Sequence, residues 1–146
     1  MSNPKSNARK AAVQALYQWQ MTGQSLCLIE QYFIDQQFFV DEPNVHKNFF
    51  TTLFHGVPKD LIAIDALLSE FVDREVDAID PVERAILRLG AFELIHCSDT
   101  PYKVIINESI DLAKYFGADG SHRYVNGILD KAAQKQRAEE IQRKQK

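Results

Sequence analysis

Apolar residues in the first part of the chain recur every three to four positions, the spacing of one face of an α-helix. From residue 8 this pattern predicts a first helix that stops near Gly23, with the buried face Ala8, Ala11, Ala12, Ala15, Leu16 and Trp19. Ser25 can cap a second helix that runs to about Phe39, with the packing residues Leu28, Ile29, Tyr32 and Phe33. Residues 41–43 then predict a turn.

Two more helices are expected before the middle of the chain. One helix is predicted over residues 44–55 and stops at Gly56. One of its sides carries Phe49, Phe50, Leu53 and Phe54. Pro58 suits the first turn of a helix over residues 59–72. The backbone N–H groups of a first turn have no partner within the helix, so proline, which has no N–H group, loses no hydrogen bond there. The core candidates of that helix are Leu61, Ile64, Ala66, Leu67, Leu68 and Phe71.

The helix starts in the second half are sharper. Asp80, Pro81 and Glu83 fit an N-cap, a first-turn proline and a capping-box acid. They predict a helix to about His96 with the interior residues Ile86, Leu89, Phe92 and Leu94 or Ile95.

The last two predicted helices follow directly. Thr100 and Pro101 repeat the cap-plus-proline start for a helix that ends at Phe116, and Gly117 suits a left-handed C′ position. Ser121 is expected to cap the final helix, whose apolar positions are Val125, Ile128, Leu129, Ala132 and Ala133.

The pattern sums to about seven helices with short connections, so the predicted fold class is all-α. Residues 72–79 are acidic and lack clear periodicity, and we expect them to separate an N-terminal from a C-terminal helical layer. Both layers are too small to be separate domains. We expect one compact helical domain over residues 1–134 and a polar, basic tail over residues 135–146 that is a solvated helix end or disordered.

Length and composition agree with an ordinary soluble globular protein, with 146 residues, 45% apolar and 25% charged. Cys27 and Cys97 form no C-x-x-C pair, and the first ten residues hold no apolar stretch typical of a signal peptide. No apolar run approaches the ~18 residues that span a bilayer. We therefore expect a cytoplasmic protein with reduced thiols and no membrane association.

Charge is distributed unevenly along the chain. Residues 1–20 carry +3 and residues 131–146 carry +4, so a net charge of −3 leaves −10 for the 110 residues between them. Two basic ends that lie close together in the fold would form a patch suited to a polyanion, whereas two frayed ends would only be solvated.

Motifs for catalysis or metal binding are absent: there is no P-loop, G-x-G-x-x-G, H-E-x-x-H or G-x-S-x-G, and the four histidines are scattered over different helices. We therefore expect no enzyme activity, no cofactor and no metal.

Two binding signals remain. Lys10 and Tyr17 share the outer face of the first helix, where an aromatic ring could stack on an unpaired base. Residues 117–127 lead a glycine loop into a helix start, where backbone N–H groups could hold a phosphate. The structural alternatives are a packed Tyr17 and an ordinary helix junction.

Four segments form a specific combination along nearly the whole chain: AAVQALYQWQ (residues 11–20), VERAILRL (82–89), PYKVIINESIDLAK (101–114), and FGA with SHRYVNGILDK (116–118 and 121–131). In their order and spacing they resemble the NusB family of bacterial transcription antitermination factors. The four together are far more specific than any one of them.

The resemblance implies an all-helical protein of two packed helical subdomains without catalysis. It also implies a heterodimer with ribosomal protein NusE that binds boxA, a single-stranded element of ribosomal RNA leader transcripts, and joins an antitermination complex on RNA polymerase. The basic first helix is the family's RNA-contacting element. Here the stretch KSNARK (residues 5–10) replaces the dense arginine run of many members, so we expect modest RNA affinity from the protein alone.

From these signals we expect one continuous RNA-binding surface made of Lys5, Arg9, Lys10, Tyr17, Ser121, His122 and Arg123. The resemblance places the NusE contact on the C-terminal helices, and there we expect four charged residues outside the apolar positions of one helix: Glu83, Arg84, Arg88 and Glu93. A basic partner would be steered by the acidic middle of the chain.

Two alternatives keep the fold and change the function. One is a helical RNA-binding or adaptor module related to the N-terminal domain of ribosomal RNA cytosine methyltransferases, for whose catalytic domain 146 residues leave no room. The other is a structural adaptor that does not contact RNA. The sequence leaves the oligomeric state open, and the resemblance includes homodimers.

Overall fold

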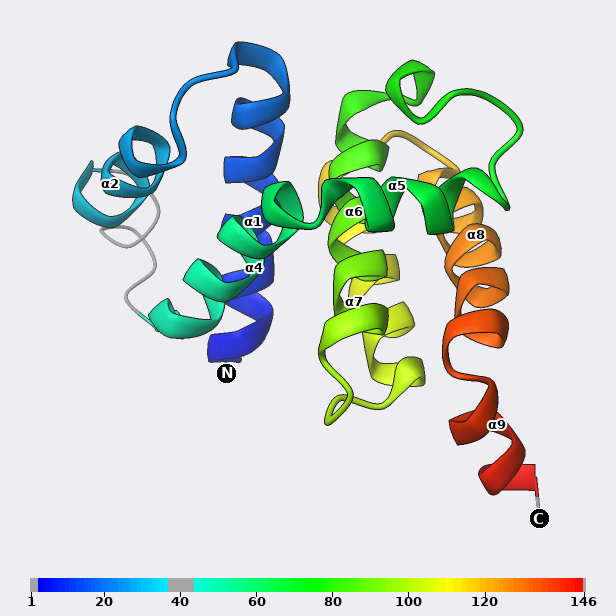
Figure 1. Ribbon diagram of the computed structural model, residues 1–146. Coiled ribbons are helices and arrows are strands. Elements are labelled where there is room, and N and C mark those ends of the chain that lie inside the picture. Colours follow the sequence, from blue (N-terminus) through cyan, green and yellow to red (C-terminus); the bar gives the residue numbers. More distant parts are fainter. Residues whose placement is uncertain (1–2, 37–43, 146) are drawn as a thin grey trace. The chain divides into compact units, whose positions relative to one another are not determined.

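The computed structural model describes residues 3–36 and 44–145, and in these ranges every regular element is helical (Figure 1). The chain divides into two compact units, residues 1–59 (unit 1) and residues 60–146 (unit 2). The prediction of an all-α protein built from two helical parts is therefore confirmed. No helix in the described ranges is both long and apolar enough to cross a membrane.

Unit 1 contains α1 (Pro4–Thr22), α2 (Leu26–Gln36) and α4 (Lys47–Lys59). The side chain of Asn3 caps α1 by accepting hydrogen bonds from two backbone N–H groups, and Gly23 ends the helix in the left-handed region at φ 67°. The ring of Phe33 in α2 stacks on Phe50 of α4, and Phe50 stacks in turn on Phe54 of its own helix. The remaining core of the unit is formed by Ala8, Ala11, Ala12, Ala15, Leu16, Ile29, Leu53 and Val57.

Two expectations for unit 1 are wrong. Helix α4 does not stop at Gly56 but continues through the buried Val57 and through Pro58. It ends at Lys59, one residue after the proline. Leu28 and Tyr32 are 64% and 43% exposed, because one narrow edge of α2, with Ile29 and Phe33, makes the apolar contact. The expected end of this helix at Phe39 and the turn at residues 41–43 lie outside the described residues.

Unit 2 contains α5 (Leu61–Ser69), the short 3-10 helix η1 (Val76–Ala78), α6 (Pro81–His96), α7 (Tyr102–Phe116), α8 (Ser121–Gln136) and α9 (Ala138–Gln145). Residues 72–79, which we expected to divide the two layers, lie inside this unit, and the boundary falls between Lys59 and Asp60. Helix α6 packs against α5, α7 and α8, and all its residues from 85 to 94 are buried. Close packing at its middle depends on Gly90, where a Cβ would lie 2.7 Å from Leu129 Cδ1.

The helix starts in unit 2 follow the sequence signals only in part. Asp80 caps α6 as predicted, accepting from the N–H groups of Val82 at 3.0 Å and Glu83 at 3.2 Å. The expected capping box does not form, because the Glu83 carboxylate accepts a hydrogen bond from Ser121 instead. Thr100 is not a cap, since Pro101 occupies the N-cap position of α7 and provides no side-chain bond.

The junction between α7 and α8 also differs from the prediction. The left-handed residue is Gly120, at φ 85°, whereas Gly117 is extended at φ −87° and ψ 171°. Ser121 is the first residue of α8 rather than its cap. Gly117 is nevertheless required for another reason: a Cβ would lie 2.7 Å from both the Ala113 carbonyl oxygen and Ser121 Cβ.

The core candidates of α5 were partly correct. Ile64, Leu67 and Leu68 are buried, but Ala66 is exposed and Phe71, beyond the helix end, is only half-buried. In the tail, α8 extends to Gln136 and α9 occupies residues 138–145. This part of the tail is helical, and Arg137 and Ile141 are buried at 8% and 9% exposure, so it is not simply solvated.

The two glycines give a stability test. We expect Gly117→Ala to destabilise the protein by about 1–3 kcal/mol, because the new methyl group overlaps a backbone oxygen and a packed Cβ. The matched control is Gly127→Ala at an exposed position of α8, where a Cβ meets nothing within 4 Å. This change should stabilise by about 0.5–1 kcal/mol through helix propensity. Urea denaturation measures both, and shifts of the same sign would contradict the assigned roles.

Candidate nucleic-acid interface

Helix α1 presents its basic residues in two different environments. Lys5 is exposed, whereas Arg9 is only 3% exposed and Lys10 is half-buried. The Arg9 guanidinium lies 5.1 Å from the centroid of the Phe49 ring, and Lys5 Nζ lies 5.3 Å from the same centroid. The expectation that Arg9 lies on the surface is wrong, because its side chain packs on an aromatic ring of α4.

Tyr17 lies on the outer face of α1, as the helical wheel predicts, and is 40% exposed. Its ring is therefore accessible to a planar ligand, while the opposite face of the helix is covered by the core. Binding of RNA by Lys5, Lys10 and Tyr17 stays a prediction.

The start of α8 has one covered and two accessible side chains. Ser121 is 5% exposed, and its hydroxyl donates to Glu83 Oε2 at 2.7 Å, which joins the first turns of α8 and α6. His122 is half-buried and Arg123 is exposed. Ser121 is therefore wrongly placed as a surface residue, and the accessible groups of this turn are His122 and Arg123.

A basic residue missed by the sequence reading lies in the same unit. The Arg74 guanidinium lies 5.8 Å from the centroid of the Tyr124 ring, one turn into α8, and is hydrogen-bonded to Asp73. That bond raises the pKa of Arg74 and lowers the pKa of Asp73, while burial raises the pKa of the Tyr124 hydroxyl. Arg74 lies in an irregular segment, where periodicity carries no information about which residues meet.

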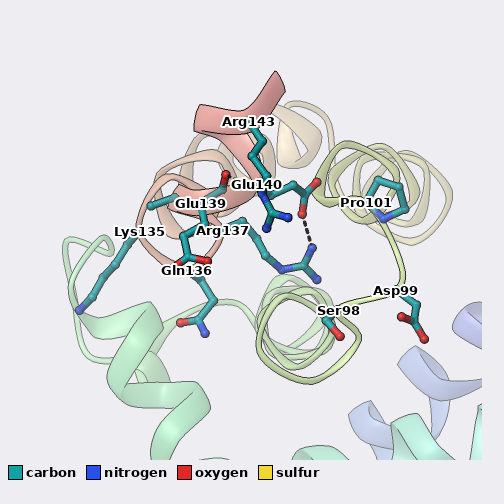
Figure 2. Close-up of a pocket in the computed structure, with 10 residues that line it drawn as sticks. Ser98, Asp99, Pro101, Lys135, Gln136, Arg137, Glu139, Glu140 and Arg143 are labelled. Carbon is teal, nitrogen blue, oxygen red and sulfur yellow. Dashed lines mark hydrogen bonds and ion pairs between the residues drawn. The ribbon is translucent and has the colours of Figure 1, made fainter. Parts of the chain in front are cut away.

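A cavity of about 700 Å³ opens in unit 2 away from the residues predicted as binding sites (Figure 2). It lies between the turn that follows α6 and the last two helices, and it is lined by Ser98, Asp99, Pro101, Lys135, Gln136, Arg137, Ala138, Glu139, Glu140 and Arg143. Its basic groups bind neighbouring protein groups: Lys135 pairs with Glu70, and Arg137 with Glu140. These two side chains are therefore paired within the protein, and they add no unpaired cation to the candidate interface.

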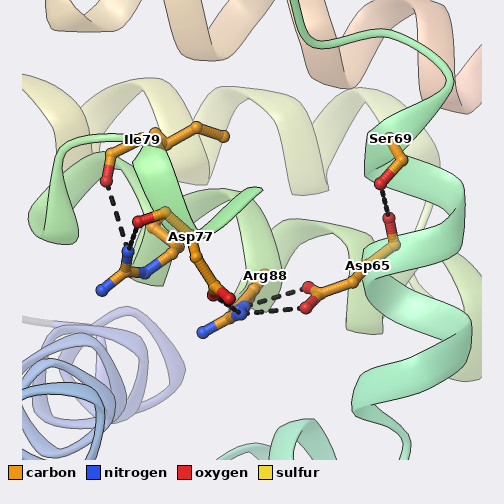
Figure 3. Close-up of polar contacts among 6 residues, drawn as sticks. Asp65, Ser69, Asp77, Ile79 and Arg88 are labelled. Carbon is orange, nitrogen blue, oxygen red and sulfur yellow. Dashed lines mark hydrogen bonds and ion pairs between the residues drawn. The ribbon is translucent and has the colours of Figure 1, made fainter. Parts of the chain in front are cut away.

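The four charged residues expected on the outer face of α6 differ in their burial and in their hydrogen-bond partners. Arg88 is 4% exposed and holds both Asp65 carboxylate oxygens, at 3.0 and 2.9 Å, with Asp77 at 3.4 Å (Figure 3). Glu93 is 1% exposed. Arg84 is half-buried and donates to the carbonyl oxygens of residues 77 and 79.

The outward placement of Arg88 and Glu93 is therefore wrong. The prediction assumed that one face of the helix is covered, but α6 is covered by α5, α7 and α8 together. Glu83 is half-buried and bound to Ser121, so among the four only Glu83 and Arg84 retain partial exposure. A contact of these residues with a partner protein stays a prediction.

Histidines and acids form pairs rather than a metal centre in the described part of the chain. His55 Nε2 lies 2.8 Å from Glu30, and His96 Nε2 lies 2.6 Å from Asp60. Within residues 3–36 and 44–145 no group of three or more histidine, cysteine, aspartate or glutamate side chains is arranged to hold a metal ion.

The described geometry defines an all-helical protein whose candidate binding groups are exposed basic and aromatic side chains on helix surfaces. The sequence model of the NusB family matches residues 6–134. The chain belongs to the NusB family.

Known proteins resemble the chain over most of its length. The transcription antitermination protein NusB of Nitrosococcus oceani is 51% identical over 141 residues, which is 97% of this chain and 93% of the relative. The NusB of Marinomonas sp. is 47% identical and aligns over 96% and 80% of the two chains.

Two solved structures show the same fold. NusB from T. maritima has a TM-score of 0.79 at 31% identity, with 92% of this chain and 93% of that chain covered. A crystal structure of antitermination factors NusB and NusE in complex with dsRNA has a TM-score of 0.75 at 23% identity, over 87% and 93% of the chains. At that identity the second likeness concerns the fold alone.

Arg88 provides a test of the structural role assigned to it. We expect Arg88→Ala to cost about 1.5–3 kcal/mol, because it removes a buried arginine and its charged hydrogen bonds to the partly buried Asp65. Arg123→Ala, on an exposed arginine of the same unit, should change stability by no more than about 0.5 kcal/mol. Chemical denaturation compares the two, and equal stabilities would contradict the stabilising role assigned to Arg88.

Proposed function

We propose that this protein is a transcription antitermination factor that binds boxA-type RNA together with ribosomal protein NusE and acts in an antitermination complex on RNA polymerase. The observation that carries the proposal is the family match over residues 6–134, nearly the whole chain. A fold relative bound to NusE and RNA supports it. The protein works by binding, without catalytic turnover, and in the cytoplasm, where its RNA is made.

The RNA-binding residues that we propose are the accessible part of the predicted set: Lys5, Lys10 and Tyr17 on α1 of unit 1 and, separately, His122 and Arg123 on α8 of unit 2. Cations neutralise phosphates, and the Tyr17 ring stacks on an unpaired base. Arg9 and Ser121 support these residues from within their own units, because the first packs on Phe49 and the second binds Glu83.

The NusE contact that we propose lies on unit 2, at the start of α6, with Glu83 and Arg84. A protein that binds ribosomal RNA is basic, and the −10 of residues 21–130 has the complementary sign. Charge then steers association, while apolar contacts provide most of the affinity.

The RNA surface is tested by titrating a boxA oligonucleotide into the heterodimer with NusE. Tyr17→Ala should weaken binding by about 1–3 kcal/mol through lost stacking. Lys10→Ala should weaken it and lower the slope of log affinity against log salt by about one. The control is Tyr115→Ala, an equally aromatic change at a 66% exposed tyrosine outside the proposed surface.

Wild-type affinity in a folded Lys5→Ala, Lys10→Ala, Tyr17→Ala protein would reject this RNA surface. The proposed function itself would fail on a different result, namely that the unmutated protein together with NusE does not bind the boxA oligonucleotide.

The NusE contact needs a substitution that preserves the Ser121 bond. Glu83→Gln keeps an oxygen acceptor for that hydroxyl and removes only the negative charge, whereas Glu83→Lys would also disturb the start of α8. We expect Glu83→Gln to slow association with NusE at low salt and to lose this effect at high salt. Stopped-flow association measures it, with Glu75→Gln, an exposed acid of the same unit, as control. An unchanged rate at low salt would remove Glu83 from the contact.

A further inference from the structure

Arg137 follows the last residue of α8 and lies beyond the segment that matches the family. Its guanidinium is inserted at the end of α6, among the last carbonyl groups of the helix and those of the turn that follows. Nε donates to the Leu94 oxygen at 2.8 Å, and Nη2 donates to the oxygens of Cys97 at 2.9 Å and Glu93 at 3.2 Å. Nη1 donates to the Thr100 oxygen at 3.0 Å, so one side chain binds both the helix end and the turn after it.

Glu140 connects this arginine to the next helix. Its Oε1 accepts from Arg137 Nη1 at 2.6 Å (Figure 2). Its Oε2 accepts from the backbone N–H of Tyr102 at 3.1 Å. Tyr102 is the first residue of α7, whose N-cap Pro101 provides no side-chain acceptor. A carboxylate from the chain terminus therefore caps α7, and the Arg137–Glu140 pair joins the end of α6 to the start of α7.

Helix α9 itself has little apolar support. Among residues 138–143, Ile141 is buried, whereas Glu139, Gln142 and Arg143 are exposed. The cavity of about 700 Å³ lies between this helix and the turn at Ser98 and Asp99, so α9 borders open space there instead of filling it. Polar bonds, more than apolar burial, hold α9 in place.

We propose that residues 137–145 form a strap that fastens the α6–α7 turn through the Arg137–Glu140 pair, and that this strap opens as a local unit while the rest of unit 2 stays folded. Few apolar contacts and many exposed side chains, as on α9, are the features of segments that open separately from a core. The core helices α6, α7 and α8 are held by a different set of contacts, centred on Gly90, Ser109 and Leu129. The strap is independent of the proposed function, since neither Arg137 nor Glu140 belongs to the proposed RNA or NusE surface.

Hydrogen exchange of the full chain, followed by mass spectrometry, tests the strap. In Glu140→Ala we expect the amides of residues 97–105 to exchange roughly tenfold faster, because the Tyr102 N–H loses its acceptor and the turn loses its clamp. Amides in the middle of α6 and α8 should keep their wild-type rates. Glu139→Ala, the exposed neighbour on the same helix, is the matched control and should exchange like the wild type.

Arg137→Lys is a second variant, which keeps the charge but loses the planar fork that reaches several carbonyl groups at once. It should accelerate exchange in the same residues. Wild-type exchange at residues 102–105 in Glu140→Ala would overturn the strap. So would faster exchange spread evenly over unit 2, or a Glu140→Ala protein that fails to fold, because either would make the tail part of the global folding unit.

Discussion

Enclosure of α6 is the constraint on which unit 2 depends. Residues 85–94 are buried without a gap, so this helix has no solvated face on which to place its polar residues. Its polar groups must therefore find partners inside the protein, because an unpaired buried charge or carbonyl group costs more than the fold can spare. Arginine meets this need at both ends of the helix: Arg84 and Arg88 bind the η1 segment near its start, and Arg137 binds the carbonyl groups at its end.

These internal arginines change what the charge of the chain means. Net charge counts Arg9, Arg88 and Arg137 with the surface lysines, yet all three are at most 8% exposed. Arg9 and Arg137 belong to the two basic ends, so the cationic surface available to a polyanion is smaller than those ends suggest. The planar guanidinium explains why arginine takes these positions, since it can bond several acceptors or lie on a ring while buried.

Local signals in the sequence predicted the parts of the fold that local interactions determine. Asp80 caps the helix that begins directly after it, and the outward position of Tyr17 follows from the alanine face of its own helix. The cap of α7 could not be predicted in this way, because it comes from Glu140, 38 residues after the N–H that it accepts. Likewise, local sequence does not distinguish Gly120, with its positive φ, from Gly117, which is needed for the approach of Ser121.

The candidate site was predicted unevenly for the same reason. A helical wheel separates covered from uncovered positions when one face is covered, as at Tyr17, but it fails at Arg9 of the same helix and along α6, where several sides are covered. The Ser121–Glu83 hydrogen bond shows the consequence for function. These two residues were assigned to different binding surfaces, yet their side chains meet at 2.7 Å. A change at either residue therefore disturbs the first turns of both α6 and α8, and the loss of one binding activity in such a variant does not by itself locate the contact.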